Sequence, residues 1–186
     1  MRVTREKAAE NRVRIVETAS RLFREKGFDG VGLDLIMKEA GLTHGGFYGH
    51  FTCKEDLAAE AVARALEQGT GLLSRYTNVA DFGSDYLSES HFADRANGCA
   101  LAALGGDMAR RRDGVRSGAT SYLRAQLERL AGFFRGTAAA RRRRAITTLA
   151  GIVGALTLAR AVEDPVLSDE ILSTARQVFG STRPAG

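Results

Sequence analysis

Cysteine is scarce in this chain of 186 residues. The two cysteines, Cys53 and Cys99, are too few for a disulfide framework. No apolar run of the signal-peptide kind follows Met1, so we expect both thiols to be free in a reducing cytoplasm. A redox role for either thiol is left open, although a single thiol without a resolving partner is usually inert.

Long apolar runs are missing too. The most apolar segment, residues 146–162, is shorter than a bilayer requires, and it contains two glycines and Arg160. We therefore expect no membrane span and no membrane partner.

Signatures of catalysis and metal binding are also absent. The three histidines, His44, His50 and His91, lack the HExxH spacing and the cysteine pairs of zinc sites. The glycine pairs at 45–46 and 105–106 lie in helical contexts without a preceding strand, which excludes a phosphate-binding loop. We expect a protein that is not an enzyme, with no catalytic residue, metal site or cofactor.

The chain does have a core-forming composition and an excess of positive charge. Its hydrophobic content of 44% is ordinary for a globular protein, and its length suits one large or two small domains. The formal charge of +5 permits an acidic partner, most commonly nucleic acid. The N-terminus could be a solvated tail or an arm that contacts phosphates, because it carries Arg2, Arg5, Lys7, Arg12 and Arg14.

Apolar residues recur at helical spacing along most of the chain, which predicts an all-α fold. We expect Gly27, Gly41 and Gly136 to end helices, and Thr52 and Ser168 to cap them. The expected helices cover residues 7–26, 33–40, 43–51, 52–76, 101–112, 115–135, 141–159 and 168–179, with at least one short helix between 78 and 98.

Residues 33–51 predict two short helices joined by a tight turn, which is a helix-turn-helix. An apolar stripe on the first helix ends at Gly41, where the turn needs a left-handed residue. Thr43 should cap the second helix through its hydroxyl, which can accept a hydrogen bond from a backbone N–H of the next turn. Phe47 and Phe51, four residues apart, should point inward.

The outward face of the second helix is polar and has little bulk. Each glycine in a helix interior costs about 1 kcal/mol relative to alanine, and close approach of another molecule would explain that cost. A merely loose first turn is the alternative. Lys54 begins the next helix, where the helix dipole disfavours a cation, so it should either meet an anion such as a DNA phosphate or be solvated. The outward face, which suits a major groove, comprises Thr43, His44, Gly45, Gly46, Tyr48 and His50.

One pattern unites the first third of the chain: Gly27-Phe28, Leu33, Ile36, Ala40–Thr43, Phe47-Tyr48, His50-Phe51 and Lys54–Leu57. It resembles the N-terminal domain of the TetR/AcrR (tetracycline-repressor) family of one-component transcriptional regulators, with departures at Val31, Gly32, Met37 and Cys53. The resemblance implies an all-α homodimer, in which a three-helix DNA-binding domain precedes a larger domain that binds a small effector. The DNA-contacting positions that it implies are Thr43, His44, Gly45, Gly46, Tyr48, His50 and Lys54.

The rest of the chain should supply the dimer interface and the effector site. Residues 145–162 are apolar nearly all round and must be covered on two sides, so with residues 168–179 they should form a four-helix interface between two copies. Tyr86 and Tyr122 stand out because a buried phenol needs a hydrogen-bond partner, which a ligand could be. We therefore expect a small, largely apolar effector with one or two polar groups, and a plain packed core is the alternative. The resemblance implies that one cavity is surrounded by Phe82, Tyr86, Leu101, Leu104, Met108, Tyr122, Leu123, Phe133 and Phe134.

We therefore expect a ligand-responsive regulator, most simply a repressor, that leaves a pseudo-palindromic operator in double-stranded DNA when its effector binds. The alternative is a helical small-molecule carrier or accessory protein without DNA binding. The recognition helix discriminates between these two functions, because a protein that had lost DNA binding would have no reason to keep Gly45, Gly46, Tyr48 and Lys54 together. The expected domains are residues 1–53 for DNA binding, 54–180 for effector binding and dimerisation, and 181–186 as a disordered tail.

Overall fold

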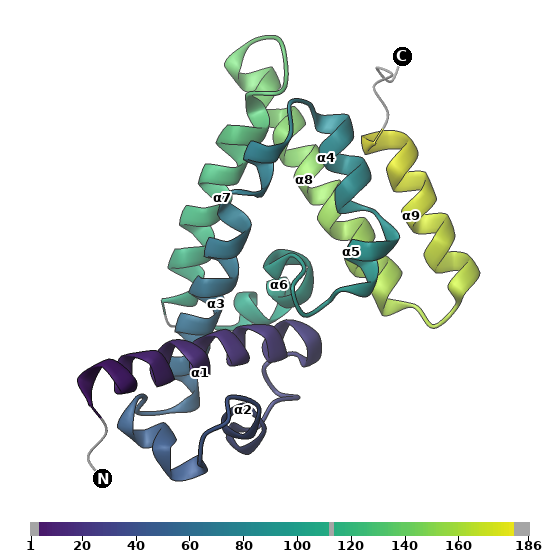
Figure 1. The fold of residues 1–186 in the computed structure, drawn as a ribbon. Coiled ribbons are helices and arrows are strands. Elements are labelled where there is room, and N and C mark those ends of the chain that lie inside the picture. The colour runs from purple at the N-terminus through teal and green to yellow at the C-terminus, as the bar shows by residue number, and fades with distance from the viewer. Residues whose placement is uncertain (1–3, 112–113, 181–186) are drawn as a thin grey trace.

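The structure is a computed structural model that describes residues 4–111 and 114–180, and the regular elements within these ranges are all helical (Figure 1). The predicted all-α fold class is confirmed. The helices are α1 (Arg5–Lys26), α2 (Leu33–Glu39), α3 (Lys54–Thr70), α4 (Val79–Tyr86), α5 (Glu89–Ala93), α6 (Ala100–Arg110), α7 (Val115–Ala131), α8 (Ala138–Ala161) and α9 (Pro165–Phe179), with two 3₁₀ helices, η1 (His44–Gly49) and η2 (Leu72–Arg75).

The buried side chains form two clusters. The first joins α1, α2, η1 and α3 to α6 and to the start of α7, and it includes Ile15, Phe23, Ile36, Phe47, Leu57 and Leu104. The second joins α4, α8 and α9 to the far end of α7, and it includes Phe82, Leu130, Ile152 and Leu172. The predicted domain boundary at residue 53 therefore lies inside the first cluster, because α3 packs against α1 (Figure 1). The predicted division of the chain remains a prediction, and its tail, 181–186, lies outside the described residues.

Helix α1 forms as its sequence predicts and begins two residues earlier. The Thr4 hydroxyl caps it by accepting a hydrogen bond from the Lys7 N–H at 3.2 Å. Gly27 ends it with φ of +74°, a conformation that glycine adopts without a side-chain clash. The chain then folds back, so that the Phe23 and Phe28 rings meet edge to face with centroids 4.9 Å apart.

Two predicted helices end earlier than expected. α3 stops at Thr70 instead of continuing to Tyr76, and the chain from Leu72 to Arg75 is a separate 3₁₀ turn. Glycines at 69 and 71 weaken the helix at this point. α7 stops at Ala131, so residues 133–135 lie beyond it, and Gly136, with φ of +116°, belongs to the loop instead of ending the helix.

Two predicted caps are wrong. The N-cap of α3 is Cys53, and the Thr52 hydroxyl instead donates to the Asp56 carboxylate. The N-cap of α9 is Asp164, whose carboxylate accepts from two backbone N–H groups, because Pro165 occupies the first helical position that suits its fixed φ. Ser168 is buried inside α9 and donates to the Ala159 carbonyl at 3.0 Å.

Helix α8 is longer than the apolar segment in the sequence, because Thr137 caps it and its first turns carry the arginines. Among the described helices, it alone is long and apolar enough to cross a membrane by length and composition. Core helices of globular proteins meet the same criterion. In this fold α8 packs between α7 and α9 and buries Ile152 and Leu156 completely, although 28% of its most apolar stretch is buried within the protomer (Figure 1).

The turn between α2 and η1 has the expected left-handed residue. Gly41 has φ of +68°, and the next N–H, of Leu42, donates to the Met37 carbonyl at 2.8 Å. Beyond the turn, Phe47 is fully buried and its ring stacks on that of Phe51 with centroids 5.6 Å apart. The predicted inward direction of both rings is confirmed.

We expect Phe47→Ala to lower the free energy of unfolding by about 3 to 5 kcal/mol, since it leaves a cavity beneath the turn. The matched control is the neighbouring Tyr48→Ala, which removes an aromatic ring that is 63% exposed and should change stability by about 0.5 kcal/mol or less. Urea denaturation of both variants measures the difference. Equal losses of stability would mean that Phe47 does not hold the motif together.

Candidate functional site

The residues predicted to enter a DNA groove lie on one short exposed segment, residues 43–51, which we call the recognition segment. Its helical part is the 3₁₀ helix η1 and not the α-helix that the sequence predicts. The Thr43 side chain makes no capping hydrogen bond, and its carbonyl instead accepts from the Gly46 N–H at 3.0 Å. Three glycines in six residues favour the α-helix poorly, so the segment closes with tighter i to i+3 bonds.

The glycines of the recognition segment are not required by packing within the chain. A side-chain carbon built at Gly45 would meet no described atom within 4 Å, and one at Gly46 would lie 3.7 Å from its nearest neighbours, an ordinary contact. Their lack of bulk therefore serves no internal contact. The exposed positions of the segment are Thr43, His44, Gly45, Gly46, Tyr48 and Gly49, while His50 is half-buried.

Two of the predicted DNA-contacting side chains already have partners within the chain. His44 Nδ1 lies 2.5 Å from the exposed Asp34 carboxylate of α2, so the imidazole is held beside the start of that helix. Lys54 Nζ donates to the Phe28 carbonyl at 2.6 Å and is half-buried. One of the three N–H groups of its ammonium is thus engaged by the carbonyl just beyond α1, and a phosphate contact through the others stays a prediction.

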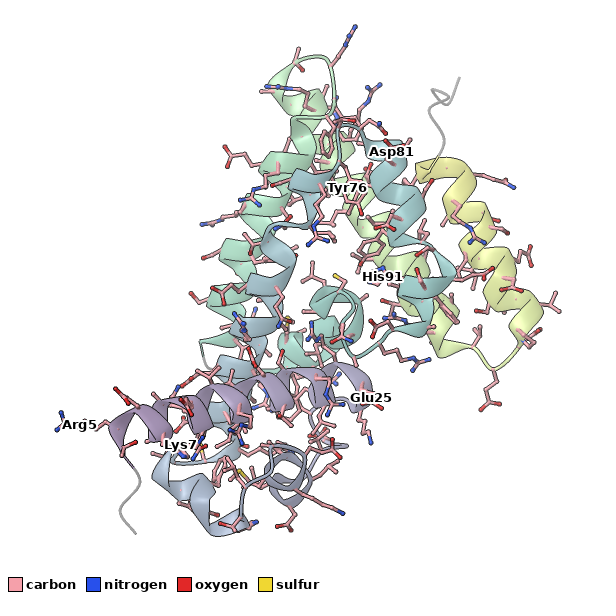
Figure 2. The ribbon with its side chains drawn as sticks, viewed as in Figure 1. Arg5, Lys7, Glu25, Tyr76, Asp81 and His91 are labelled. Carbon is pink, nitrogen blue, oxygen red and sulfur yellow. The ribbon has the colours of Figure 1, made fainter. Side chains whose placement is uncertain are left out.

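The basic residues of α1 differ in what they contact. Arg12 forms a bidentate ion pair with Glu60 of α3, with both N–O distances 2.5 Å, and its guanidinium lies over the Phe51 ring. Arg14 donates to the Ala40 carbonyl at 3.4 Å, and Lys7 pairs with Glu10. Arg5 extends away from the ribbon at the free end of α1 (Figure 2). Arg2, the fifth residue of the predicted basic arm, lies outside the described residues.

A cavity of about 440 Å³ lies between α3, η2, α4, the α5–α6 loop and α7, and we call it the central cavity. Of the nine residues that the sequence analysis placed around an effector, Phe82, Tyr86 and Tyr122 line it. The other six do not line it: Leu101, Leu104 and Met108 pack in or against the first core cluster, and Leu123, Phe133 and Phe134 pack against the second. The central cavity therefore does not support those six assignments.

The wall of the central cavity is more polar than predicted. Several of its polar residues come from the α4–α6 region, where the sequence has little helical periodicity, so no pattern pointed to them. Arg24 lies at the end of α1, far along the chain from the rest. The polar residues that the sequence analysis missed are Arg24, Gln68, Arg75, Tyr76, Asp85, Ser88, Ser90, His91, Asp94, Asn97 and Cys99.

Three phenols of the cavity wall remain protonated at neutral pH. Tyr76 donates to the Asp85 carboxylate, and burial together with this bond raises its pKa to about 12. Burial is also the main cause that raises the pKa of Tyr86 and of Tyr122. The Tyr86 hydroxyl is buried without a hydrogen bond to the described residues, although the Cys99 thiol is close enough to contribute to its raised pKa.

His91 ties the ends of α4 and α6 together. Its Nδ1–H donates to the Tyr86 carbonyl at 2.6 Å, and its Nε2 accepts from the Cys99 N–H at 3.1 Å. The second bond requires a neutral ring, and burial lowers the His91 pKa in agreement with that state. Within the described ranges, no cluster of three or more His, Cys, Asp or Glu side chains could hold a metal ion.

Comparison with known proteins identifies the recognition segment and its supporting helices. The family model "Bacterial regulatory proteins, tetR family" matches residues 15–61. A curated HTH-type transcriptional regulator of Staphylococcus aureus (strain bovine RF122 / ET3-1) is 36% identical over 83 residues, which make up 44% of this chain and 43% of that protein. The match therefore spans less than half of the length of this relative.

Solved structures extend the likeness to the whole fold. A TetR-family transcriptional regulator from Cytophaga hutchinsonii superimposes with a TM-score of 0.74 over 96% of this chain and 98% of its own, at 21% identity. A TetR transcriptional regulator from Chloroflexus aurantiacus gives a TM-score of 0.73 over 92% and 95%, at 22% identity. At these identities the structures establish the fold, while the N-terminal matches identify the domain. Residues 15–61 form a TetR-family helix-turn-helix domain, and the whole chain has the fold of TetR-family regulators.

Proposed function

We propose that this protein is a homodimeric, DNA-binding transcriptional regulator of the cytoplasm, a repressor that a small-molecule effector releases from its operator. The observation that carries the proposal is the recognition segment: exposed, low in bulk, and held in place by the fully buried Phe47. It lies within residues 15–61, which match the family model, and its glycines serve no packing need inside the chain.

In the proposed complex the recognition segment of each protomer enters a major groove. Tyr48 contacts a phosphate, and His44, held by Asp34, lies nearest to the base edges. Two copies related by a two-fold axis read pseudo-palindromic half-sites about one helical turn apart, roughly 34 to 36 Å, or somewhat more.

Selection of bound fragments from genomic DNA tests the proposal directly. We expect recovery of a pseudo-palindromic site, whose position also identifies the regulated genes. If the purified protein bound every fragment equally across a salt titration, specific regulation would be refuted, because sequence-independent binding comes from phosphate contacts alone.

We expect Tyr48→Ala to weaken affinity for the selected operator about tenfold or more, as the loss of a hydrogen bond to a charged group does. Tyr48 is exposed, so the variant should fold normally. Lys54→Ala is a poorer test than the sequence suggested, because it also removes the bond to the Phe28 carbonyl. Fluorescence anisotropy measures both affinities, and an unchanged Tyr48→Ala affinity would contradict the assignment.

We expect Arg5→Ala to reduce the salt slope of operator binding by about 1, as the loss of one phosphate contact does. Arg142→Ala is the matched control, since it removes the same charge from an exposed position at the start of α8, away from α1 (Figure 1). Equal slopes for the two variants would mean that Arg5 belongs to a solvated tail.

The proposed dimer interface is the exposed apolar face of α8 and α9. Seven large hydrophobic side chains are exposed among the described residues, and five of them lie on these two helices: Ile146, Leu158, Val166, Leu167 and Val178. Phe179 is not among them, because its ring packs at Gly151, where a built side-chain carbon would lie 2.2 Å from Phe179 Cζ. Gly154 has open space above it and can admit a partner helix.

We expect Val178→Glu to give monomers or insoluble protein, because an obligate interface of this kind buries more than about 2,000 Å² and cannot desolvate an unpaired carboxylate. Val178 is 61% exposed, so the change should leave the protomer fold intact. The control is Val13→Glu on α1, which is 56% exposed and lies outside the proposed interface. Sedimentation velocity measures the mass, and a wild-type monomer at micromolar concentration would refute the dimer.

The central cavity is the proposed effector site. Its volume of about 440 Å³ lies within the range of sites that enclose small molecules. An effector releases DNA by binding more tightly to a conformation in which the two recognition segments no longer match the half-sites.

A further inference from the structure

Arg24 is a buried cation in the wall of the central cavity. It lies in the last turn of α1 with 5% of its surface exposed. Its guanidinium donates to the Ser20 carbonyl at 3.2 Å, the Gly98 carbonyl at 3.3 Å and Gln68 Oε1 at 3.0 Å. All three acceptors are uncharged, and Arg24 forms no salt bridge with any carboxylate of residues 4–111 and 114–180.

The carboxylates that line the same cavity are engaged elsewhere. Both Asp94 oxygens accept from the Asn97 side chain, and Asp85 accepts from the Tyr76 hydroxyl. Asp94 is close enough to favour the charge of Arg24, but the larger effect is burial, which lowers the Arg24 pKa. The positive charge is therefore desolvated and only partly compensated.

A buried charge without a bonded counter-ion is costly, and pairing it with an anion in good geometry recovers part of that cost. Arginine cannot relieve the cost by losing its proton, since its pKa is far above neutral pH. Three of the five guanidinium N–H groups of Arg24 have partners in the described chain, which leaves two for a ligand in the cavity.

The Tyr86 hydroxyl is a second sign of a ligand. Tyr86 is 4% exposed and lines the same cavity, and in the described chain its oxygen has only the Cys99 thiol, a weak hydrogen-bonding group, beside it. Because its pKa is raised, the phenol keeps its proton and can donate it to an oxygen of a ligand. An acceptor-rich group suits both Arg24 and Tyr86.

We propose that the effector of the central cavity is a small organic acid, whose carboxylate pairs with Arg24 and accepts a hydrogen bond from Tyr86. The apolar part of the acid packs against the aromatic wall that includes Phe82 and Tyr122. This assignment narrows the small, largely apolar effector expected from sequence to one with a carboxylate, and its regulatory consequence rests on the proposed function.

The acid also has a direct route to the DNA-reading part of the molecule. Arg24 belongs to α1, Gln68 to α3, and Gly98 to the loop before α6. A carboxylate that pairs with the two remaining N–H groups draws the guanidinium toward the cavity and weakens its bonds to the Gly98 carbonyl and the Gln68 amide, which are uncharged acceptors. Binding therefore shifts the balance between the contacts that α1 makes with the rest of the chain and its contacts with the ligand.

Matched acids and amides test the proposal on the full-length protein by isothermal titration calorimetry. The pairs are benzoate and benzamide, phenylacetate and phenylacetamide, and 3-phenylpropionate and its amide. We expect at least one acid to bind about tenfold or more tightly than its amide, as hydrogen bonds to a charged group do. Equal or tighter binding of the amides, or no binding of any acid, would overturn the proposal.

Variants identify the charge responsible. Arg24→Gln should remove the preference for the acid, and Arg24→Lys should retain part of it. The matched control is Arg75→Gln, which removes an exposed charge from the same cavity wall and should keep most of the preference, since water screens it. A preference that survived Arg24→Gln, or that Arg75→Gln removed equally, would refute the role of Arg24. If circular dichroism shows that Arg24→Gln does not fold, the Arg24→Lys variant and the wild-type acid and amide pairs still test the role of Arg24.

Operator binding without ligand separates this inference from the proposed function. If wild type binds its operator but shows no preference for acids, the inference alone fails. If acids bind at Arg24 but no operator is found, the proposed function fails and the acid site stands.

Discussion

The packing of α1 against α3 is the contact on which both candidate sites depend. Phe23 and Ile15 from α1 and Leu57 from α3 are all fully buried in the first core cluster. The recognition segment lies against one end of this packing, since four residues separate the end of η1 from the start of α3, whose N-cap is Cys53. The central cavity lies at the other end, where Ala65, Gln68 and Gly69 of α3 form part of its wall. One helix of 17 residues, about 25 Å long, therefore reaches both sites.

The contacts that reinforce this packing use charge that would otherwise be available to DNA. Arg12 pairs with Glu60, and Arg64 pairs with Glu17, so each links α1 to α3. Arg21 pairs with Glu39 and links α1 to α2. The chain's formal charge of +5 is thus a poor guide to the proposed DNA-binding face, since some basic side chains of α1 pair with acidic side chains of α2 and α3.

Sequence predicted those features whose cause is local. Gly27 and Gly41 end helices because of their own backbone freedom, and Phe47 points inward because of helical spacing, so each could be predicted. The partner of Lys54 could not, because the Phe28 carbonyl is 26 residues away and only the fold brings it near. The polar cavity wall was missed for the same reason. From its position in the sequence, Arg24 is a cation in the last turn of α1, where it complements the helix dipole. Its burial depends on Gln68 and Gly98, which lie 44 and 74 residues further along the chain.

The energies at Arg24 are of the size that a regulatory switch needs. A hundredfold loss of operator affinity requires a differential of about 2.7 kcal/mol between the DNA-binding conformation and its alternative. A hydrogen bond to a charged group contributes about 1.5 to 3 kcal/mol, and Arg24 makes two such bonds that cross from α1 to other elements. The free energy of these two bonds alone is comparable to the required differential. A cavity ligand that moves the Arg24 guanidinium can therefore change operator affinity without a large displacement of the core. It requires only a conformation in which α1 and α3 are stable without the Arg24 bonds to Gln68 and Gly98.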